Sequence, residues 1–371
     1  MRHAILLGLA LWVAAGSAQA RLVGLPDCPA SSDKICRVNI PPNMTELLNR
    51  LSGKETTWWR EGDRFTIAAR RKADSVELLG VFHESMTRVA NTDFWFLTVK
   101  SPLLDRAIFD VAMKGETVHT GKNEWRGPDA PATPKRASYS KLHVENIVLD
   151  SPNLGEKRKI AIYLPPGYDP AKRYPVVYLG DGQNTQWEAQ FVEPLITSGK
   201  IPSLIMVGPS NSASPITVDG KTMQRRTADY ILNHTPENAY FLKHEAFFLK
   251  EVMPLAESKF GASPRPEDRL LTGRSASADW AVDTALRHPD LFGYAVGLSP
   301  SVPHDGPFGP KGPKLFLTNS EIMDWTDGSE TAAKAKAAGE DVVLETHVSG
   351  HANVMWDIQL TDALIWAFGG R

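Results

Sequence analysis

Short apolar runs that alternate with helix-like segments dominate the second half of the chain, and they constrain its fold most. Between residues 141 and 371 such runs end in glycine, proline or a polar corner, as in YPVVYLGDG, SLIMVGPS and RLLTGRS. Helical patterns separate several of them, notably AYFLKHEAFFLKEVMPLAESKFG and SADWAVDTALRHPDLFG. This alternation predicts an α/β fold with a mostly parallel sheet and helices on both faces. In such sheets, functional sites form at the carboxyl ends of the strands.

Residues 55–120 have a different pattern, which predicts a small β domain. RFTIAARR, SVELLGVF and DFWFLTVK are rich in β-branched and aromatic residues and alternate in part between apolar and polar positions. Short strands at this spacing are typical of a β-sandwich. The following stretch, 121–140, is rich in proline, alanine and charge, as expected of a linker to a catalytic domain at 141–371.

The first 20 residues have the features of a secretory signal peptide. Arg2 and His3 precede the apolar run AILLGLALWVAAG, and Ala18-Gln19-Ala20 fits the small-x-small cleavage rule. The alternative, a membrane anchor, is disfavoured because the run is short, and no later stretch of the sequence is long and apolar enough to span a bilayer. The sequence therefore predicts a periplasmic or secreted protein whose mature chain begins near Arg21.

The only two cysteines, Cys28 and Cys36, lie in the predicted N-terminal arm at 21–54. In an oxidising compartment such a pair indicates a small disulfide loop, and a zinc site is disfavoured because no histidine is near. The formal net charge of −2 gives no support for a general nucleic-acid or membrane-surface role. No metal, nucleotide or flavin motif is present in the sequence, so no cofactor is predicted. The oligomeric state does not follow from the sequence.

Ser275 is the candidate nucleophile, because it stands in the corner between an apolar run and a helical segment. The sequence Gly273-Arg274-Ser275-Ala276-Ser277 approximates the G-x-S-x-G nucleophile elbow, with Ser277 in place of the second glycine. Small neighbours are needed because this turn is strained and crowded. A simple helix-capping role is the alternative, but the strand–corner–helix context favours catalysis.

A serine nucleophile needs a general base and an acid that orients the base. In α/β hydrolases the chain order is serine, acid, histidine. His351 follows the last predicted strand and precedes a terminal helix, so we expect it to be the base. Glu321 comes soon after the strand KLFLT and is the favoured acid, with Asp324 as the alternative.

The backbone N–H groups of Gln183 and Ala276 are predicted to form the oxyanion hole. Gln183 ends the sequence YLGDGQ, in which an apolar strand runs into a glycine-rich turn, and Ala276 directly follows the nucleophile. Asp181, in the same turn, is expected to hold the backbone rather than to take part in catalysis.

The chain resembles the enterochelin (ferric enterobactin) esterases of the α/β-hydrolase superfamily. The resemblance covers most of residues 145–368, and TTWWREGD and VELLGVF resemble the immunoglobulin-like N-terminal domain of that family. Two features depart from the family: the elbow reads G-R-S-A-S, and this chain carries a predicted signal peptide that cytoplasmic members lack. The motifs of the catalytic part that carry the resemblance are YLPPGYDPAKRYPVVYLGDGQ, RRTADY, FLKEVMPLAESKFG, LLTGRSASADWAVDTALRHPDLFGYAVGLSPS and SGHANVMW.

The resemblance implies a serine esterase with nucleophile Ser275, base His351 and acid Glu321 or a close neighbour. It also implies a catecholate siderophore as substrate, and such a polyanionic aromatic ligand calls for arginines and aromatic rings. In the alternative, the arginines pair with local carboxylates and the tryptophans fill core. The expected wall residues are Arg225, Arg226, Arg274, Trp187 and Trp356.

Two other functions fit the sequence. Export also suits a carboxylesterase that removes acetyl or feruloyl groups from polysaccharide. A third alternative, from another class, is a non-catalytic binding protein built on a hydrolase scaffold.

Overall fold

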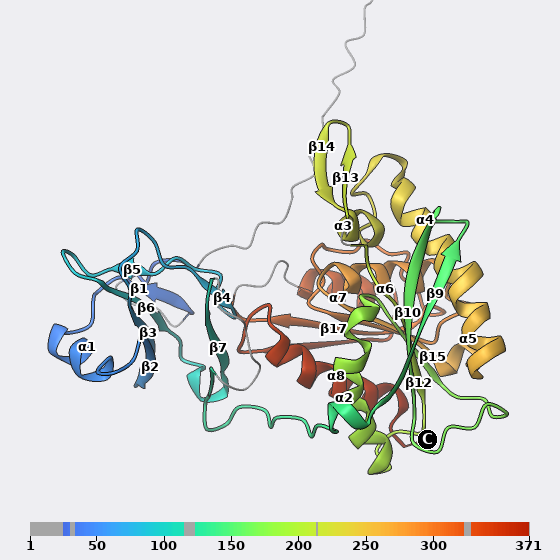
Figure 1. Cartoon of the computed structure of the whole chain (residues 1–371), viewed down its shortest axis with the longest axis horizontal. Coiled ribbons are helices and arrows are strands. Elements are labelled where there is room, and N and C mark those ends of the chain that lie inside the picture. The colour runs from blue at the N-terminus through green and yellow to red at the C-terminus, as the bar shows by residue number, and fades with distance from the viewer. Residues whose placement is uncertain (1–24, 30–33, 115–122, 213, 323–327, 371) are drawn as a thin grey trace, which may run out of the picture.

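The computed structural model describes residues 25–29, 34–114, 123–212, 214–322 and 328–370. The predicted signal peptide lies outside these residues. No helix in the described part of the chain has the length and apolar character needed to cross a membrane. Figure 1 shows the N-terminal β elements on one side of the molecule and a helix-covered sheet on the other.

The C-terminal part contains a mainly parallel sheet, as the alternating pattern predicted. Its eight strands have the order β18-β17-β16-β15-β11-β12-β10-β9, and β9 and β10 run antiparallel to the strands beside them. All other neighbouring pairs are parallel. The strands are β9 (His143–Ser151), β10 (Glu156–Leu164), β11 (Val176–Leu179), β12 (Ile205–Pro209), β15 (Arg269–Arg274), β16 (Tyr294–Leu298), β17 (Lys314–Ser320) and β18 (Val342–His347).

Helices cover both faces of this sheet, which explains its continuous apolar strands. In β11, Val176 and Tyr178 belong to a core that includes residues of α4, α5, α6 and α7, whereas Val177 and Leu179 belong to a core that includes residues of α2 and α8. Successive strand residues thus enter two different cores. The helices are α2 (Thr185–Thr197), α3 (Arg225–Tyr230), α4 (Ala239–Phe247), α5 (Met253–Phe260), α6 (Ala276–Arg287), α7 (Gly328–Ala337) and α8 (Asn353–Phe368).

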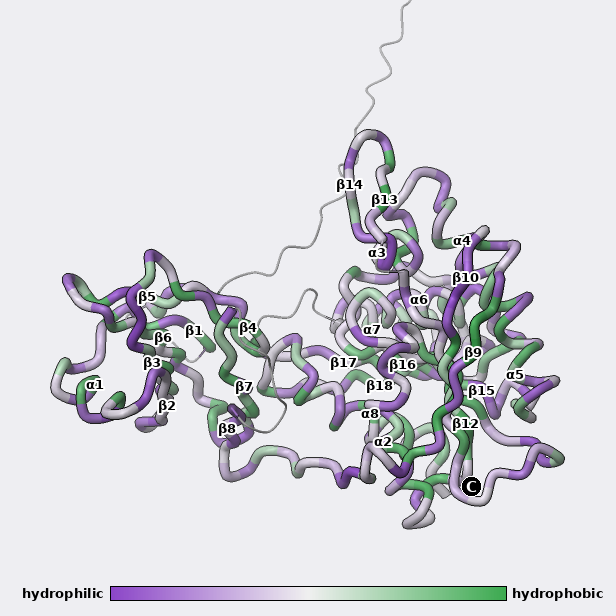
Figure 2. The backbone as a smooth tube through the Cα atoms, in the orientation of Figure 1, coloured by the Kyte–Doolittle hydropathy of each residue, from purple (hydrophilic) through white to green (hydrophobic). Residues whose placement is uncertain are grey.

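Figure 2 shows hydrophobic residues along the inner strands of the large sheet and hydrophilic residues on many of the outer turns and helices. A hairpin of β13 (Pro215–Val218) and β14 (Lys221–Gln224) projects beside α3 at the top of Figure 1. Short helical turns complete this part: η2 (Tyr139–Lys141), η3 (Gly182–Asn184), η4 (Pro236–Asn238), η5 (Phe248–Val252) and η6 (Pro266–Asp268).

The N-terminal β region consists of two small sheets that share one core. One has the strand order β1-β6-β3-β2 with β5 on β6, and the other has the order β4-β7-β8. Phe65 from the first sheet and Phe109 from the second are fully buried, with ring centroids 5.0 Å apart. Packing of two sheets agrees with a sandwich, and the immunoglobulin-like assignment stays a prediction. The elements are β1 (Cys36–Val38), α1 (Met44–Arg50), β2 (Thr56–Glu61), β3 (Arg64–Arg70), β4 (Leu78–Gly80), β5 (Thr87–Arg88), β6 (Phe94–Lys100), η1 (Leu104–Arg106), β7 (Ile108–Met113) and β8 (Glu124–Arg126).

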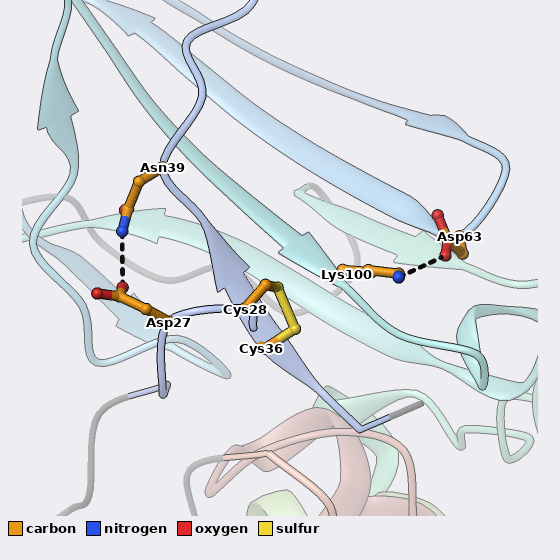
Figure 3. Close-up of a disulfide and its surroundings, with 6 residues drawn as sticks. All are labelled: Asp27, Cys28, Cys36, Asn39, Asp63 and Lys100. Carbon is orange, nitrogen blue, oxygen red and sulfur yellow. Dashed lines mark hydrogen bonds and ion pairs between the residues drawn. A yellow bond between two sulfur atoms is a disulfide. The ribbon is translucent and has the colours of Figure 1, made fainter. Parts of the chain in front are cut away.

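The predicted disulfide between Cys28 and Cys36 is present (Figure 3). It fixes the start of β1, which pairs with β6 although it lies in the range expected as an N-terminal arm. Asn39 donates a hydrogen bond to Asp27, next to the disulfide, so two contacts close the base of the same loop. β8 likewise falls within the range expected as a linker and pairs with β7.

Candidate active site

Ser275 stands in a strained turn between β15 and α6. Its backbone has φ 57° and ψ −132°, a conformation that non-glycine residues rarely adopt. The turn leaves little space, since a Cβ on Gly273 would lie 2.2 Å from the backbone oxygen of Ser277. The crowding explains why the corner needs small residues, as the sequence pattern predicted.

Ser277, the departure from the usual elbow motif, is accommodated by its own hydrogen bonds. The side chain is fully buried. Its hydroxyl donates to the backbone oxygen of Arg274 and accepts from the backbone N–H of Arg274, both at 2.9 Å. The second small position of the motif therefore tolerates a serine, because the hydroxyl closes the turn instead of remaining unsatisfied.

The hydroxyl of Ser275 is available for chemistry. Within the described residues it makes no capping hydrogen bond to α6, so the helix-cap alternative finds no support. The residue is half-buried, and its Oγ lies 3.3 Å from the Oγ of Ser301. Ala276 is the first residue of α6, and its N–H belongs to the helix terminus, where backbone donors have no intrahelical acceptor.

The glycine-rich turn after β11 lies at the same edge of the sheet. A Cβ on Gly182 would lie 1.8 Å from the backbone oxygen of Gly208, so the close approach of this turn to β12 requires glycine. Asp181 adopts a left-handed conformation with φ 56°. Arg226 donates to both of its carboxylate oxygens, with a shortest distance of 2.7 Å. Burial alone would raise the pKa of Asp181, but hydrogen bonds and the charge of Arg226 lower it, so the carboxylate stays ionised and holds the turn.

His351 lies in the loop between β18 and α8. Its half-buried ring meets the ring of Trp356 edge-on, with centroids 4.8 Å apart. The indole N–H of Trp356 donates to Ser299 Oγ at 3.1 Å, in the loop that follows β16. His351 and Ser275, the predicted base and nucleophile, therefore lie in loops at the same edge of the sheet, as the parallel strands β15 to β18 require.

The two acid candidates differ in what can be said of them. Glu321 directly follows β17, and its backbone N–H donates to the carbonyl of His347 at 2.8 Å, but its side chain is exposed. Asp324 lies outside the described residues. The choice between them remains a prediction.

Each of the three arginines predicted to bind substrate has a carboxylate partner within the protein. Arg274 is buried, with Glu188 at 3.0 Å and Asp357 at 3.1 Å. Each of the other two also has a buried carboxylate partner at 2.7 Å: Asp229 for Arg225 and Asp181 for Arg226. Carboxylates therefore compensate all three charges, as the alternative reading expected, and a role of these arginines in substrate binding stays a prediction.

The two tryptophans expected at the wall have different roles. Trp187 donates to Asp357 at 3.1 Å and lies under Arg136, so it belongs to the buried ion-pair cluster around Arg274. Trp356 contacts the His351 ring and stays a candidate wall residue.

A buried Asp–His–Asp cluster close to the Ser275 turn was not predicted from the sequence. His304 lies between Asp283, 2.8 Å from its Nδ1, and Asp279, 3.3 Å from its Nε2. Burial alone would lower the pKa of His304, but the two carboxylates raise it to about 10, so the ring is charged. Asp279 also accepts from the N–H of Ser301 at 3.0 Å and thereby fixes the loop beside Ser275. The sequence carries one signal for this cluster: Asp279 and Asp283 lie four residues apart, on one face of an alanine-rich helix, and buried carboxylates of this kind are usually paired.

The comparison with known families agrees with this geometry. The family model described as "Putative esterase" matches residues 151–363, more than half of the chain. The chain belongs to this esterase family. It is therefore a carboxylic ester hydrolase, and it shares an α/β-hydrolase-like fold with solved enterochelin esterases.

Individual relatives of the esterase are distant. The uncharacterized protein YjcH of Bacillus subtilis is 24% identical over 237 residues, which are 58% of this chain and 92% of that protein. The ferric enterobactin esterase of Salmonella typhimurium has a TM-score of 0.62 at 16% identity and covers 84% of this chain and 96% of its own. A ferulic acid esterase of Anaeromyces mucronatus has a TM-score of 0.50 at 16% identity, over 60% of this chain and 90% of its own. At these identities the structural similarity concerns the fold.

Proposed function

We propose that the esterase cleaves its substrate through an acyl-enzyme formed on Ser275. The observation that carries this proposal is the strained backbone of Ser275 at the end of β15. Within the described residues its hydroxyl makes no capping bond to α6, and it lies at the edge of the sheet where the His351 loop also emerges. Ser275 Oγ attacks the ester carbonyl carbon while His351 takes its proton. His351 then gives that proton to the departing alcohol, and a water molecule, activated by the same ring, releases the acid.

The oxyanion of each tetrahedral intermediate is held by the backbone N–H groups of Gln183 and Ala276. Ala276 contributes as the first residue of α6, where the helix terminus favours negative charge. Gln183 lies in η3, directly after the turn that Asp181 and Arg226 hold rigid. Pre-organised donors of this kind are usually the largest single contribution to acyl transfer.

Replacing the acid will identify the third member of the triad. We expect Glu321→Gln to lower kcat more than Asp324→Asn, by roughly 10²- to 10⁴-fold, because the base then loses the group that fixes its tautomer. Glu321 is favoured since it follows β17 without an intervening residue. Steady-state kinetics of both variants on one small ester measure this. A larger loss in Asp324→Asn would assign the role to Asp324 instead.

We propose a catecholate siderophore ester as the substrate and export as the localisation. The supporting observation for the substrate is the extent of structural similarity. Enterobactin esterases of Salmonella and Shigella cover 84–85% of this chain, a larger share than the catalytic part alone makes up. The ferulic acid esterase covers 60%. The predicted signal peptide and the disulfide support export.

Substrate comparison tests this proposal. We expect kcat/KM for enterobactin, with or without iron, to exceed that for feruloylated arabinoxylan by at least about a hundredfold. A site that contacts several parts of the siderophore can discriminate to this extent against a substrate that lacks those parts. The matched control is 4-nitrophenyl acetate, which reports the intact catalytic machinery alone. A higher kcat/KM for the feruloylated polysaccharide would replace the siderophore by a plant polymer and leave serine catalysis standing.

A further inference from the structure

The N-terminal β region packs directly on the loop that carries the base. Val348 and Ala352, on either side of His351, are buried in the same hydrophobic cluster as Val81 and Phe82. Ile108 on β7 binds this loop twice: its N–H donates to the carbonyl of Val348 at 3.0 Å, and its carbonyl accepts from Ser349 Oγ at 2.8 Å. The base loop is therefore held by residues more than two hundred positions earlier in the chain.

A second contact brings the turn after β4 against the residue that precedes His351. A Cβ on Gly350 would lie 2.4 Å from the backbone oxygen of Val81, so the two backbones touch. The turn itself is fixed by Asp110, a buried carboxylate that accepts from the N–H of Val81 at 2.7 Å. A Cβ on Gly80 would clash with the same carboxylate at 2.3 Å, so no other side chain fits at that position.

His83 follows this turn and presents an exposed side chain on a rigid backbone. Phe82 before it is fully buried, and Glu84 after it forms an ion pair with Arg37 at 3.1 Å. Desolvation lowers the pKa of His83, and the charge of His351 lowers it further, so the surroundings favour the neutral form of this ring. A neutral imidazole offers one hydrogen-bond donor and one acceptor.

We propose that His83 is a specificity-determining residue of the active site, which binds the alcohol half of the ester. This inference rests on the proposed function. His351 delivers its proton to the leaving alcohol. A group next to His351, on the side where the N-terminal β region packs, is therefore expected to contact the alcohol and not the acyl group. The ligand that fits His83 is an alcohol with neighbouring amide or hydroxyl groups, because these groups can accept a hydrogen bond from the imidazole and donate one to it.

The test uses two esters with the same acetyl group and different alcohols, O-acetyl-N-acetylserinamide and 4-nitrophenyl acetate. In the full-length His83→Ala variant, we expect kcat/KM for the serinamide ester to fall about 5- to 10-fold, as for loss of one neutral hydrogen bond, while the nitrophenyl ester changes less than about twofold. The deacylation rate after the nitrophenyl burst should not change, because the alcohol has then left. His83→Gln, which keeps a donor and an acceptor, should restore most of the loss.

His143→Ala is the matched control, because His143 is exposed and lies on β9, at the opposite edge strand of the sheet. Unfolding curves of all variants should agree with the wild type, since His83 is exposed. Equal effects of His83→Ala on both esters, or no effect on either, would overturn the role of His83 while serine catalysis stands. If the wild type cleaves neither ester and Ser275 does not react with a fluorophosphonate, the proposed function fails and the inference fails with it.

Discussion

Ser275→Ala is expected to lower ester hydrolysis by at least about a thousandfold, because removal of the nucleophile leaves only the oxyanion hole and binding to accelerate the reaction. The fold should not change. The Ser275 hydroxyl is 3.3 Å from Ser301 Oγ and supports no cap of α6 within the described residues. Alanine meets the same backbone strain at φ 57° as serine does, so the turn loses little stability.

The measurement is kcat/KM on a small ester together with labelling by a fluorophosphonate. The wild type should be labelled at one site and Ser275→Ala not at all. Ser258→Ala is the control, since Ser258 is an exposed serine on α5 whose hydroxyl bonds only within its own helix. Activity above about a hundredth of wild type in Ser275→Ala would remove Ser275 from the mechanism and favour the non-catalytic binding function.

Local patterns carried much of the prediction. The run Val176–Leu179 has no polar residue, and that pattern predicts burial on both faces, which the packing of β11 confirms. The corner at Ser275 could be predicted because small residues and a strand–helix change of period are both visible within a few positions. The predicted disulfide depended only on two nearby cysteines.

Long-range partners could not be predicted in the same way. An arginine looks the same in a sequence whether it faces a ligand or a buried carboxylate, and Asp357 is 83 residues away from Arg274. The contact of the N-terminal region with the loop that contains His351 was missed for the same reason. His83 carries no local signal, because its position depends on contacts between β7, the turn after β4 and the loop before α8.

The ion pairs of Arg274 connect three elements of the site. Arg274 directly precedes Ser275, Glu188 lies on α2 after the glycine-rich turn that follows β11, and Asp357 lies on α8 after the His351 loop. Burial raises the pKa of Glu188 to about 7 even though the charge of Arg274 lowers it, and the pKa of Asp357 is raised for the same reason. Arg274 is thus the charge that makes two buried carboxylates tolerable at neutral pH.

Arg274→Met should therefore destabilise the protein by about 3–5 kcal/mol at pH 8, because it leaves buried carboxylates without their cation. The effect should be clearly smaller at pH 5. A carboxyl whose pKa is raised in the folded state contributes stability below its unfolded pKa and loses that contribution as pH rises through the folded pKa. Loss of Arg274 raises the pKa of Glu188 and Asp357 further, so both stay protonated at pH 5 at little cost in free energy. At pH 8 the folded state must either bury two unpaired carboxylates or keep the carboxyls protonated, and both cost free energy relative to the unfolded chain.

Urea unfolding of wild type and Arg274→Met at pH 5 and pH 8 measures this difference. Arg269→Met is the control that separates the effect of an unpaired buried charge from the effect of lost packing. Arg269 is a buried arginine on the same strand, but its partner Glu257 has a side chain 31% exposed, so water can solvate the carboxylate that remains. The free energy of unfolding of Arg269→Met should therefore be lower than that of the wild type by similar amounts at pH 5 and pH 8. Arg274→Met combined with Glu188→Gln and Asp357→Asn should recover much of the loss at pH 8, because neutral amides carry no charge to compensate. Equal destabilisation of Arg274→Met at pH 5 and pH 8 would mean that the side chain acts through packing, and its ion pairs would then not explain how the elbow, α2 and α8 are held together.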